Sequence, residues 1–262
     1  MTSKPTFQIN NTTYKLSIQL NLNGFSFCIA NSERQIIVEE NCFELQQLSS
    51  EQVLFEKLKQ AFDTKPELQA KFEIIEVIYA HELYCFVPKE IYDSTNKAAY
   101  FKYTLKTLAT DYISEDTVAA VPIINLFIPY VNINNYLVER FNEFSYRHSS
   151  SLLLDYVLKK EALETQKKVY LYFQINHFDI IVLKGSKLEL FNTFSHQAST
   201  DVLYYTLFVL EQLGLSPEST TVKILNDCKS EVFELLFTYI RNLEKSNTSQ
   251  SAVLLHHLAL NL

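Results

Sequence analysis

Glycine is scarce in this chain of 262 residues, which holds three glycines where average usage predicts about 18. Loops that bind phosphate groups need glycine, because their backbone N–H groups must approach the phosphate closely. The scarcity therefore argues against nucleotide chemistry. Cysteine is also sparse, and the four cysteines show no Cys-x-x-Cys spacing. We expect them to be reduced, buried side chains rather than metal ligands.

Positive charge is lacking as well. The net charge is −7, and the densest basic cluster is Lys167-Lys168. A protein that binds nucleic acid or an anionic membrane surface needs a basic face, so neither partner is expected. Residues 1–15 contain no apolar segment like that of a signal peptide. The longest apolar run, residues 118–131, is interrupted by prolines and is too short to span a bilayer. We therefore expect a cytoplasmic protein.

Two stretches of the sequence resemble each other. LNLNGFSFCI occupies Leu20–Ile29, and FQINHFDIIV occupies Phe173–Val182. Aligned without a gap, they agree in apolar and polar character at nearly every position, and Asn23 aligns with Asn176. Each stretch predicts a strand, a two-residue turn and a second strand. The sequence therefore predicts a duplicated unit with two similar halves.

The elements after each hairpin come in a similar order. Each half is predicted to hold three strands, a helix, a strand and a helix, and the first half carries an added strand and helix. We expect the halves to occupy residues 1–150 and 151–262. Strands are predicted at 16–22, 25–30, 34–38, 72–79, 83–87, 169–175, 178–183, 187–194 and 221–226, with broken extended chain at 117–129. Helices are predicted at 51–62, 95–108, 132–142, 151–163, 201–213 and 231–243, and 252–262 is either strand or helix.

This order of elements, with its repeated three-strand meander, resembles the actin-like ATPase fold, which pairs two RNase H-like halves. More narrowly, the chain resembles an uncharacterised bacterial domain-of-unknown-function family with that fold. The resemblance covers residues 16–243 and rests on element order and on the weak repeat. It implies an α/β fold with mixed sheets and a cleft between the halves, and it brings no known activity.

Members of that superfamily that hydrolyse ATP carry Asp-x-Gly in the first hairpin of each half. The carboxylate orders water around Mg²⁺, and the glycine lets backbone N–H groups reach the phosphates. The corresponding residues here are Asn21, Asn23 and Gly24 in the first half and Asn176, His177 and Asp179 in the second. The first turn has no acid, the second has no glycine, and the chain has no adjacent glycines. The resemblance therefore implies a shared fold that has lost the ATPase machinery, with no cofactor.

These six residues are nevertheless the candidates for a binding site. Backbone amides at the first turn could hold a small anion, although a tight hairpin turn explains the pattern more simply. His177 and Asp179 point to the same side of a strand and could share a proton. A solvated turn is the commoner use of such a pair.

Two other catalytic arrangements are weaker. An RNase-H-type nuclease needs carboxylates on the first and fourth strands to hold two metals, and Asn21 and Gln174 stand in the first strands. His148 precedes three serines, but sequence neighbours rarely form a catalytic triad, and the serines are typical of a helix start. His81 is expected in a surface loop.

The many aromatic residues are the remaining signal. Helix 201–213 is apolar nearly all round, so Tyr204, Tyr205 and Phe208 are expected in the core. Phe141, Phe144 and Tyr146 are the better candidates for an exposed face, where aromatic side chains serve protein contacts.

We therefore expect a non-catalytic interaction or scaffold protein that binds a protein partner or a second copy of itself. The alternative is a nucleotide- or small-anion-binding protein that uses the cleft between the halves. Neither a metal nor nucleic acid is expected to be bound.

Overall fold

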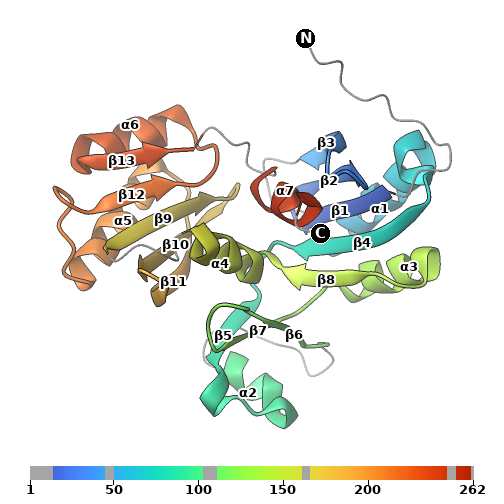
Figure 1. Ribbon diagram of the computed structural model, residues 1–262, viewed down its shortest axis with the longest axis horizontal. Helices are drawn as coiled ribbons and strands as arrows, with labels where there is room; N and C mark the ends of the chain where they lie inside the picture. Colours follow the sequence, from blue (N-terminus) through green and yellow to red (C-terminus); the bar gives the residue numbers. More distant parts are fainter. Residues whose placement is uncertain (1–13, 45–49, 103–110, 161–165, 247–251, 261–262) are drawn as a thin grey trace. The chain divides into compact units, whose positions relative to one another are not determined.

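The computed structural model describes residues 14–44, 50–102, 111–160, 166–246 and 252–260 (Figure 1). The chain forms two compact units: the first contains residues 1–153 and 254–262, and the second contains residues 154–253. Each unit holds a five-stranded mixed sheet, which confirms the predicted α/β class. No helix in these described ranges combines the length and the apolar character needed to cross a bilayer.

The sheet of the first unit has the order β3-β2-β1-β4-β8. Strands β1, β2 and β3 form an antiparallel meander, and β4 and β8 run parallel to β1. Alternate side chains of β1 (Leu16, Ile18 and Leu20) are buried in the core, as the period of two predicts. The strand bounds are Tyr14–Asn21 for β1, Gly24–Asn31 for β2, Ile36–Glu44 for β3, Phe72–Tyr79 for β4 and Ser145–His148 for β8.

Helices cover both faces of this sheet. On one face, α1 (Glu51–Thr64) and α3 (Val131–Phe141) contribute Leu58 and Leu137 to the core. The Ser50 hydroxyl accepts a hydrogen bond from the N–H of Val53 at 3.3 Å and so caps the start of α1. On the opposite face lies α7 (Ala252–Leu260), which settles the undecided segment as a helix (Figure 1).

A small subdomain interrupts the first unit between β4 and β8. Its sheet has the order β5-β7-β6, and α2 packs against it through Phe101. The broken extended chain predicted at 117–129 is in fact the end of β6, a turn and β7. The predicted helix 95–108 is shorter at its start, because a 3₁₀ turn precedes α2, and its residues 103–108 lie outside the described residues. The bounds are Tyr84–Pro88 for β5, Ser114–Thr117 for β6, Ile123–Phe127 for β7 and Lys97–Phe101 for α2, with 3₁₀ turns at Pro66–Gln69, Lys89–Ile91 and Ser94–Asn96.

The sheet of the second unit has the order β11-β10-β9-β12-β13, the same order as in the first sheet. Helices α5 and α6 pack on its core face, and α4 (Ser149–Lys160) begins in the first unit and ends in the second. A common origin of the two units stays a prediction, as does a division near residue 150. The bounds are Lys167–Phe173 for β9, His177–Lys184 for β10, Lys187–Ser195 for β11, Thr221–Ile224 for β12, Asn242–Lys245 for β13, Ser199–Gln212 for α5 and Ser230–Tyr239 for α6.

Helix α5 differs from its prediction. Tyr204 and Phe208 are 62% and 42% exposed, so the helix is not buried all round. They lie one turn apart, and their rings stack on the outer face at a centroid distance of 6.1 Å. Gly214 follows the helix with a φ of 63°, the left-handed conformation that commonly ends a helix.

Candidate functional site

The first hairpin turn is closed by its own side chains. Asn21 pairs with Gly24, so the two-residue turn is Leu22-Asn23, one residue earlier than the sequence suggested. The physical reason is a local hydrogen bond: the N–H of Asn23 donates to the side-chain oxygen of Asn21 at 2.8 Å. Asn23 is 6% exposed. The turn therefore uses one of its amide donors internally, and no carboxylate lies within it.

The second turn is similarly held by the chain around it. The N–H of Gln174 donates to the carbonyl of His177 at 2.9 Å, and the N–H of His196 donates to the carbonyl of Asn176 at 2.9 Å. The carboxylate of Asp179 is 6% exposed and accepts a hydrogen bond at 2.5 Å from the hydroxyl of Thr193 on the neighbouring strand β11. A proton shared between His177 and Asp179 stays a prediction.

A buried polar cluster surrounds His148 in the first unit. Its Nδ1 lies 2.7 Å from the hydroxyl of Ser150, and its Nε2 lies 3.0 Å from the carbonyl oxygen of His81. Since a carbonyl can only accept, Nε2 carries the proton and Nδ1 accepts from the serine hydroxyl. The side-chain amide of Asn125 donates to the hydroxyls of Ser150 and Ser151 at 2.9 and 2.8 Å.

This cluster has the bonding pattern of a serine activated by histidine, but it is enclosed. Ser150 is 1% exposed, His148 is 0% and His81 is 8%, so His81 does not lie in the surface loop predicted from the sequence. The serines begin α4, as predicted, and the backbone N–H of His148 donates to the carboxylate of Asp116 at 2.6 Å. These polar groups thus supply hydrogen-bond partners to the backbone at the start of a buried helix.

An open groove lies against α3 in the first unit. Its volume is about 470 Å³. We call it the α3 groove. Its lining consists of Tyr112, Val131, Asn134, Asn135, Val138, Asn142, Glu143, Phe144 and Tyr146.

The α3 groove exposes apolar groups to solvent. Tyr112 is 56% exposed, Val138 49% and Val131 42%. Phe144 and Tyr146 line the groove with ring centroids 5.8 Å apart, at positions where the sequence suggested surface aromatics. Burial raises the pKa of Tyr146, which keeps its hydroxyl neutral. The third suggested residue, Phe141, instead packs edge-on against Phe62 in the core at 5.5 Å.

Polar side chains fix the floor of the α3 groove. The hydroxyl of the buried Tyr79 donates to the side-chain oxygen of Asn134, which orients that amide. The hydroxyls of Tyr146 and Ser114 lie 3.4 Å apart. Asn142 ends α3 with a φ of 63°, and its N–H donates to the carbonyl of Val138 at 2.8 Å. The groove is therefore a formed surface with apolar walls and fixed amides.

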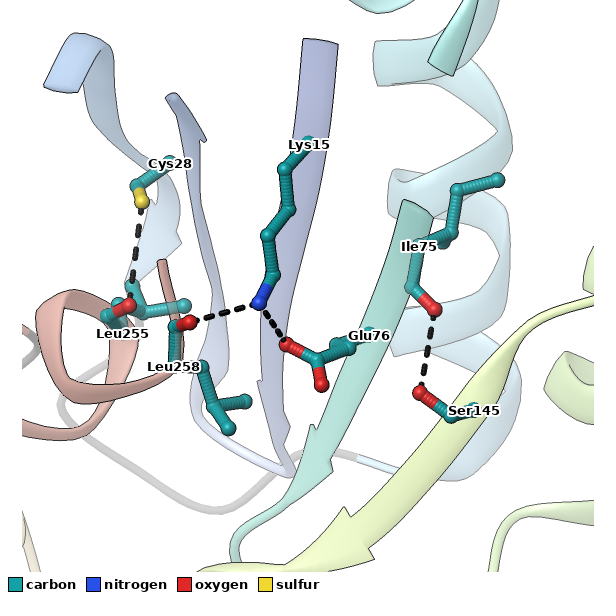
Figure 2. Close-up of polar contacts among 7 residues, drawn as sticks. All are labelled: Lys15, Cys28, Ile75, Glu76, Ser145, Leu255 and Leu258. Atoms are coloured by element: carbon teal, nitrogen blue, oxygen red, sulfur yellow. Dashed lines mark hydrogen bonds and ion pairs between the residues drawn. The ribbon is translucent and has the colours of Figure 1, made fainter. Parts of the chain in front are cut away.

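The sheet face beneath α7 is polar, unlike the face beneath α1. Figure 2 shows Lys15 between the carboxylate of Glu76 at 2.6 Å and the carbonyl of Leu258 at 2.7 Å. The thiol of Cys28 lies 4.0 Å from the carbonyl of Leu255 (Figure 2), and burial raises its pKa to about 12. The side-chain oxygens of Ser17 and Gln19 are buried without a hydrogen-bond partner among the described residues.

Comparisons with known proteins agree with this architecture. The family described as "Protein of unknown function (DUF3822)" matches residues 4–243. The chain belongs to the DUF3822 family. A comparison with curated proteins gives no match.

Solved structures show the fold that this DUF3822 member adopts. It is similar to a protein of Bacteroides thetaiotaomicron VPI-5482 described as having an actin-like ATPase fold and unknown function, with a TM-score of 0.80, 21% identity and 95% coverage of each chain. It is also similar to a chain of the PilM–PilN type IV pilus biogenesis complex, with a TM-score of 0.59, 10% identity, and coverage of 95% of this chain and 97% of that one. The actin-like ATPase fold implied by the sequence is thereby confirmed.

The turns of this DUF3822 member do not fit a magnesium nucleotide. The side-chain oxygen of Asn21 is neutral and already accepts the N–H of Asn23. The acid that follows the second turn in sequence, Asp179, is buried and bonded to Thr193. Among the described residues, no group of three or more His, Cys, Asp or Glu side chains could hold a metal ion.

Proposed function

We propose that this protein is a non-catalytic protein-binding component, and that the α3 groove is its binding surface. The observation that carries the proposal is the exposure of Val131, Val138 and Tyr112 in a groove that Phe144 and Tyr146 also line. Such a patch with a polar rim is typical of a protein interaction site, because covering it removes apolar surface from water.

The turns support the non-catalytic part of the proposal. Both hairpins keep the fold of a nucleotide-binding superfamily, while their polar groups bond within the chain. The structural neighbour PilM is described in a complex with a second protein, PilN. That description concerns PilM, and it supports protein binding as one use of this fold.

Thermal unfolding with nucleotides tests the non-catalytic part. We expect no saturable rise in melting temperature with Mg-ATP, Mg-ADP or Mg-GTP. A ligand present at a hundred times its Kd stabilises the native state by about 2.7 kcal/mol, which a melt resolves easily. A saturable rise would overturn the non-catalytic proposal and favour the nucleotide-binding alternative.

Site-specific crosslinking tests the α3 groove. A photo-crosslinking amino acid replaces Val138 in the groove or, as the control, its neighbour Glu139, which is exposed on the same helix outside the groove. In cells of the source organism, we expect a discrete crosslinked protein from position 138 and none from position 139. That protein, once purified, should bind the Val138→Glu variant at least tenfold more weakly than the wild type. Equal binding to both would refute the groove as the surface.

A further inference from the structure

The outer edge of β8 lies beside the α3 groove. β8 is the last strand of the first sheet, and in the described part of the chain no strand pairs with its other side. Such an edge presents backbone N–H and C=O groups that can pair with another chain. The edge is short, since β8 spans only Ser145–His148.

The alternation of backbone direction along β8 decides which residue has its N–H and C=O groups on the outer edge. The N–H of His148 donates to the carboxylate of Asp116 and therefore points away from β4. Backbone groups in a parallel strand alternate in direction, so the N–H and C=O of Tyr146 point to the same outer side. The side chain of Tyr146 lines the α3 groove. The groove and the pairing edge therefore meet at one residue.

Charge indicates what the groove accepts. Of the described residues that line it, only Glu143 carries a charge. The nearby Arg140 is held on the core side, where its guanidinium lies 4.7 Å from the ring centroid of Phe62 and donates to the carbonyl of Phe62. The groove thus has an acidic end, and the whole chain carries a net charge of −7. A second copy would bring the same charge, whereas a segment with Lys or Arg complements it.

We infer that the occupant of the α3 groove is an extended segment of a partner protein that adds to the edge of β8 at Tyr146. An apolar side chain of the segment fills the space between Val131, Val138 and Tyr112, and a Lys or Arg lies beside Glu143. Backbone pairing supplies affinity, and the apolar and acidic contacts supply specificity. This inference rests on the proposed function and names its partner class.

Selection from a phage library of random twelve-residue peptides tests the inference. The wild-type protein is the bait, and clones that bind the support without the protein are removed. We expect enriched peptides with an apolar residue close to a Lys or Arg. In fluorescence anisotropy, Val138→Glu should weaken binding of a selected peptide at least tenfold. Glu143→Lys should weaken it several-fold and should prefer the peptide in which Glu replaces the basic residue.

Backbone methylation tests the strand geometry. Methylation of single peptide amides should abolish binding at the one amide that donates to the carbonyl of Tyr146 and should have little effect at the two amides beside it, because neighbouring N–H groups of an added strand point in opposite directions. Loss at no position, or at consecutive positions, would overturn strand addition. Circular dichroism and melting temperature show whether each variant is folded, and Glu143→Lys with the charge-swapped peptide provides a gain of binding that a misfolded variant cannot give.

The outcomes separate the inference from the proposed function. If position 138 crosslinks a partner through a folded helix or an acidic segment, the inference is wrong and the protein-binding function stands. If position 138 crosslinks a second copy of this chain, the groove serves self-association and the inference is again wrong. If it crosslinks nothing and the library yields no groove-dependent peptide, both are overturned.

Discussion

The ion pair beneath α7 is a buried interaction whose loss should destabilise the first unit. The side chain of Lys15 is 4% exposed, and its ammonium contacts the Glu76 carboxylate and the carbonyl of Leu258. In the Glu76→Gln variant, the buried ammonium keeps only neutral acceptors. Breaking a buried pair in this way costs about 3–5 kcal/mol. Since Glu76 is 23% exposed and water screens it partly, we expect a loss near the lower end, about 3 kcal/mol.

The double variant Lys15→Met, Glu76→Leu isolates the cause. Removing both charges leaves no unpaired ion, so most of the lost stability should return, to within about 1 kcal/mol of the wild type. Part of the remainder should come from Leu258, whose carbonyl near the end of α7 loses a favourable cation.

The second unit offers a matched control. Lys223 and Glu244 lie opposite each other on the parallel strands β12 and β13, with an N–O distance of 3.3 Å. Their side chains are 28% and 60% exposed. An exposed pair contributes little, so Glu244→Gln should cost less than about 1 kcal/mol.

Urea unfolding followed by circular dichroism measures these free energies. Alkylation of Cys28, which is buried beneath α7, reports on the first unit by itself, because the two units need not unfold together. If Glu76→Gln lies within about 0.5 kcal/mol of the wild type, the reasoning about the buried ion fails. It also fails if the double variant is as unstable as the single one.

Two further predictions concern α7, which buries Cys28, and Asp201 at the start of α5. Deletion of residues 252–262 should raise the alkylation rate of Cys28 at pH 8 at least a hundredfold, because burial raises the pKa of this thiol to about 12 and the thiolate is the reactive form. Thiol labelling in a variant whose other cysteines are serines measures this rate. An unchanged rate would show that α7 does not protect the thiol. The pKa of Asp201 is lowered because its carboxylate accepts the N–H groups of Ala198 and Gln197, each at 2.9 Å. A lowered native pKa means that the stabilisation is present above the unfolded pKa and is lost as the pH falls through the native pKa. Asp201→Ala should therefore melt at a lower temperature than the wild type at pH 7, and the difference in melting temperature should shrink in acid. A difference that stays constant with pH would contradict this.

The order of the elements could be predicted because each is encoded locally. Leu16–Leu20 alternates apolar and polar residues, and Ser50 stands where a helix needs a cap. Strands β8 and β13 were missed because each has only four residues with a single apolar or aromatic one, whereas β12, which is equally short, contains Val222 and Ile224. The predicted helix 231–243 accordingly ran through to the start of β13, whereas α6 ends at Tyr239.

The site was harder to predict because its parts are distant in sequence. His81 and His148 meet in space although 67 positions separate them, and no spacing rule indicates that contact. The α3 groove draws its lining from the approach to β6, from α3 and from β8. Phe144 and Tyr146 were suggested as surface aromatics by their position alone. Their neighbours Val131 and Val138 gave no signal, since an apolar residue on a helix normally indicates its core face.

Two neighbouring residues of α3 allow the contribution to stability to be measured separately from the contribution to binding. Leu137 is fully buried in the core, whereas Val138 is 49% exposed in the α3 groove. Leu137→Ala should destabilise the first unit by about 2–5 kcal/mol, because it opens a cavity. Val138→Ala should cost less than about 0.5 kcal/mol of stability, because its side chain is already half in water.

Binding should rank these two variants the other way. Under native conditions, Leu137→Ala should bind a groove-selected peptide as the wild type does, while Val138→Ala should lose several-fold affinity through the missing apolar contact. Urea unfolding and fluorescence anisotropy on the same preparations give both rankings. If Val138→Ala lost as much stability as Leu137→Ala, Val138 would belong to the core. Its exposure would then be no argument for a partner.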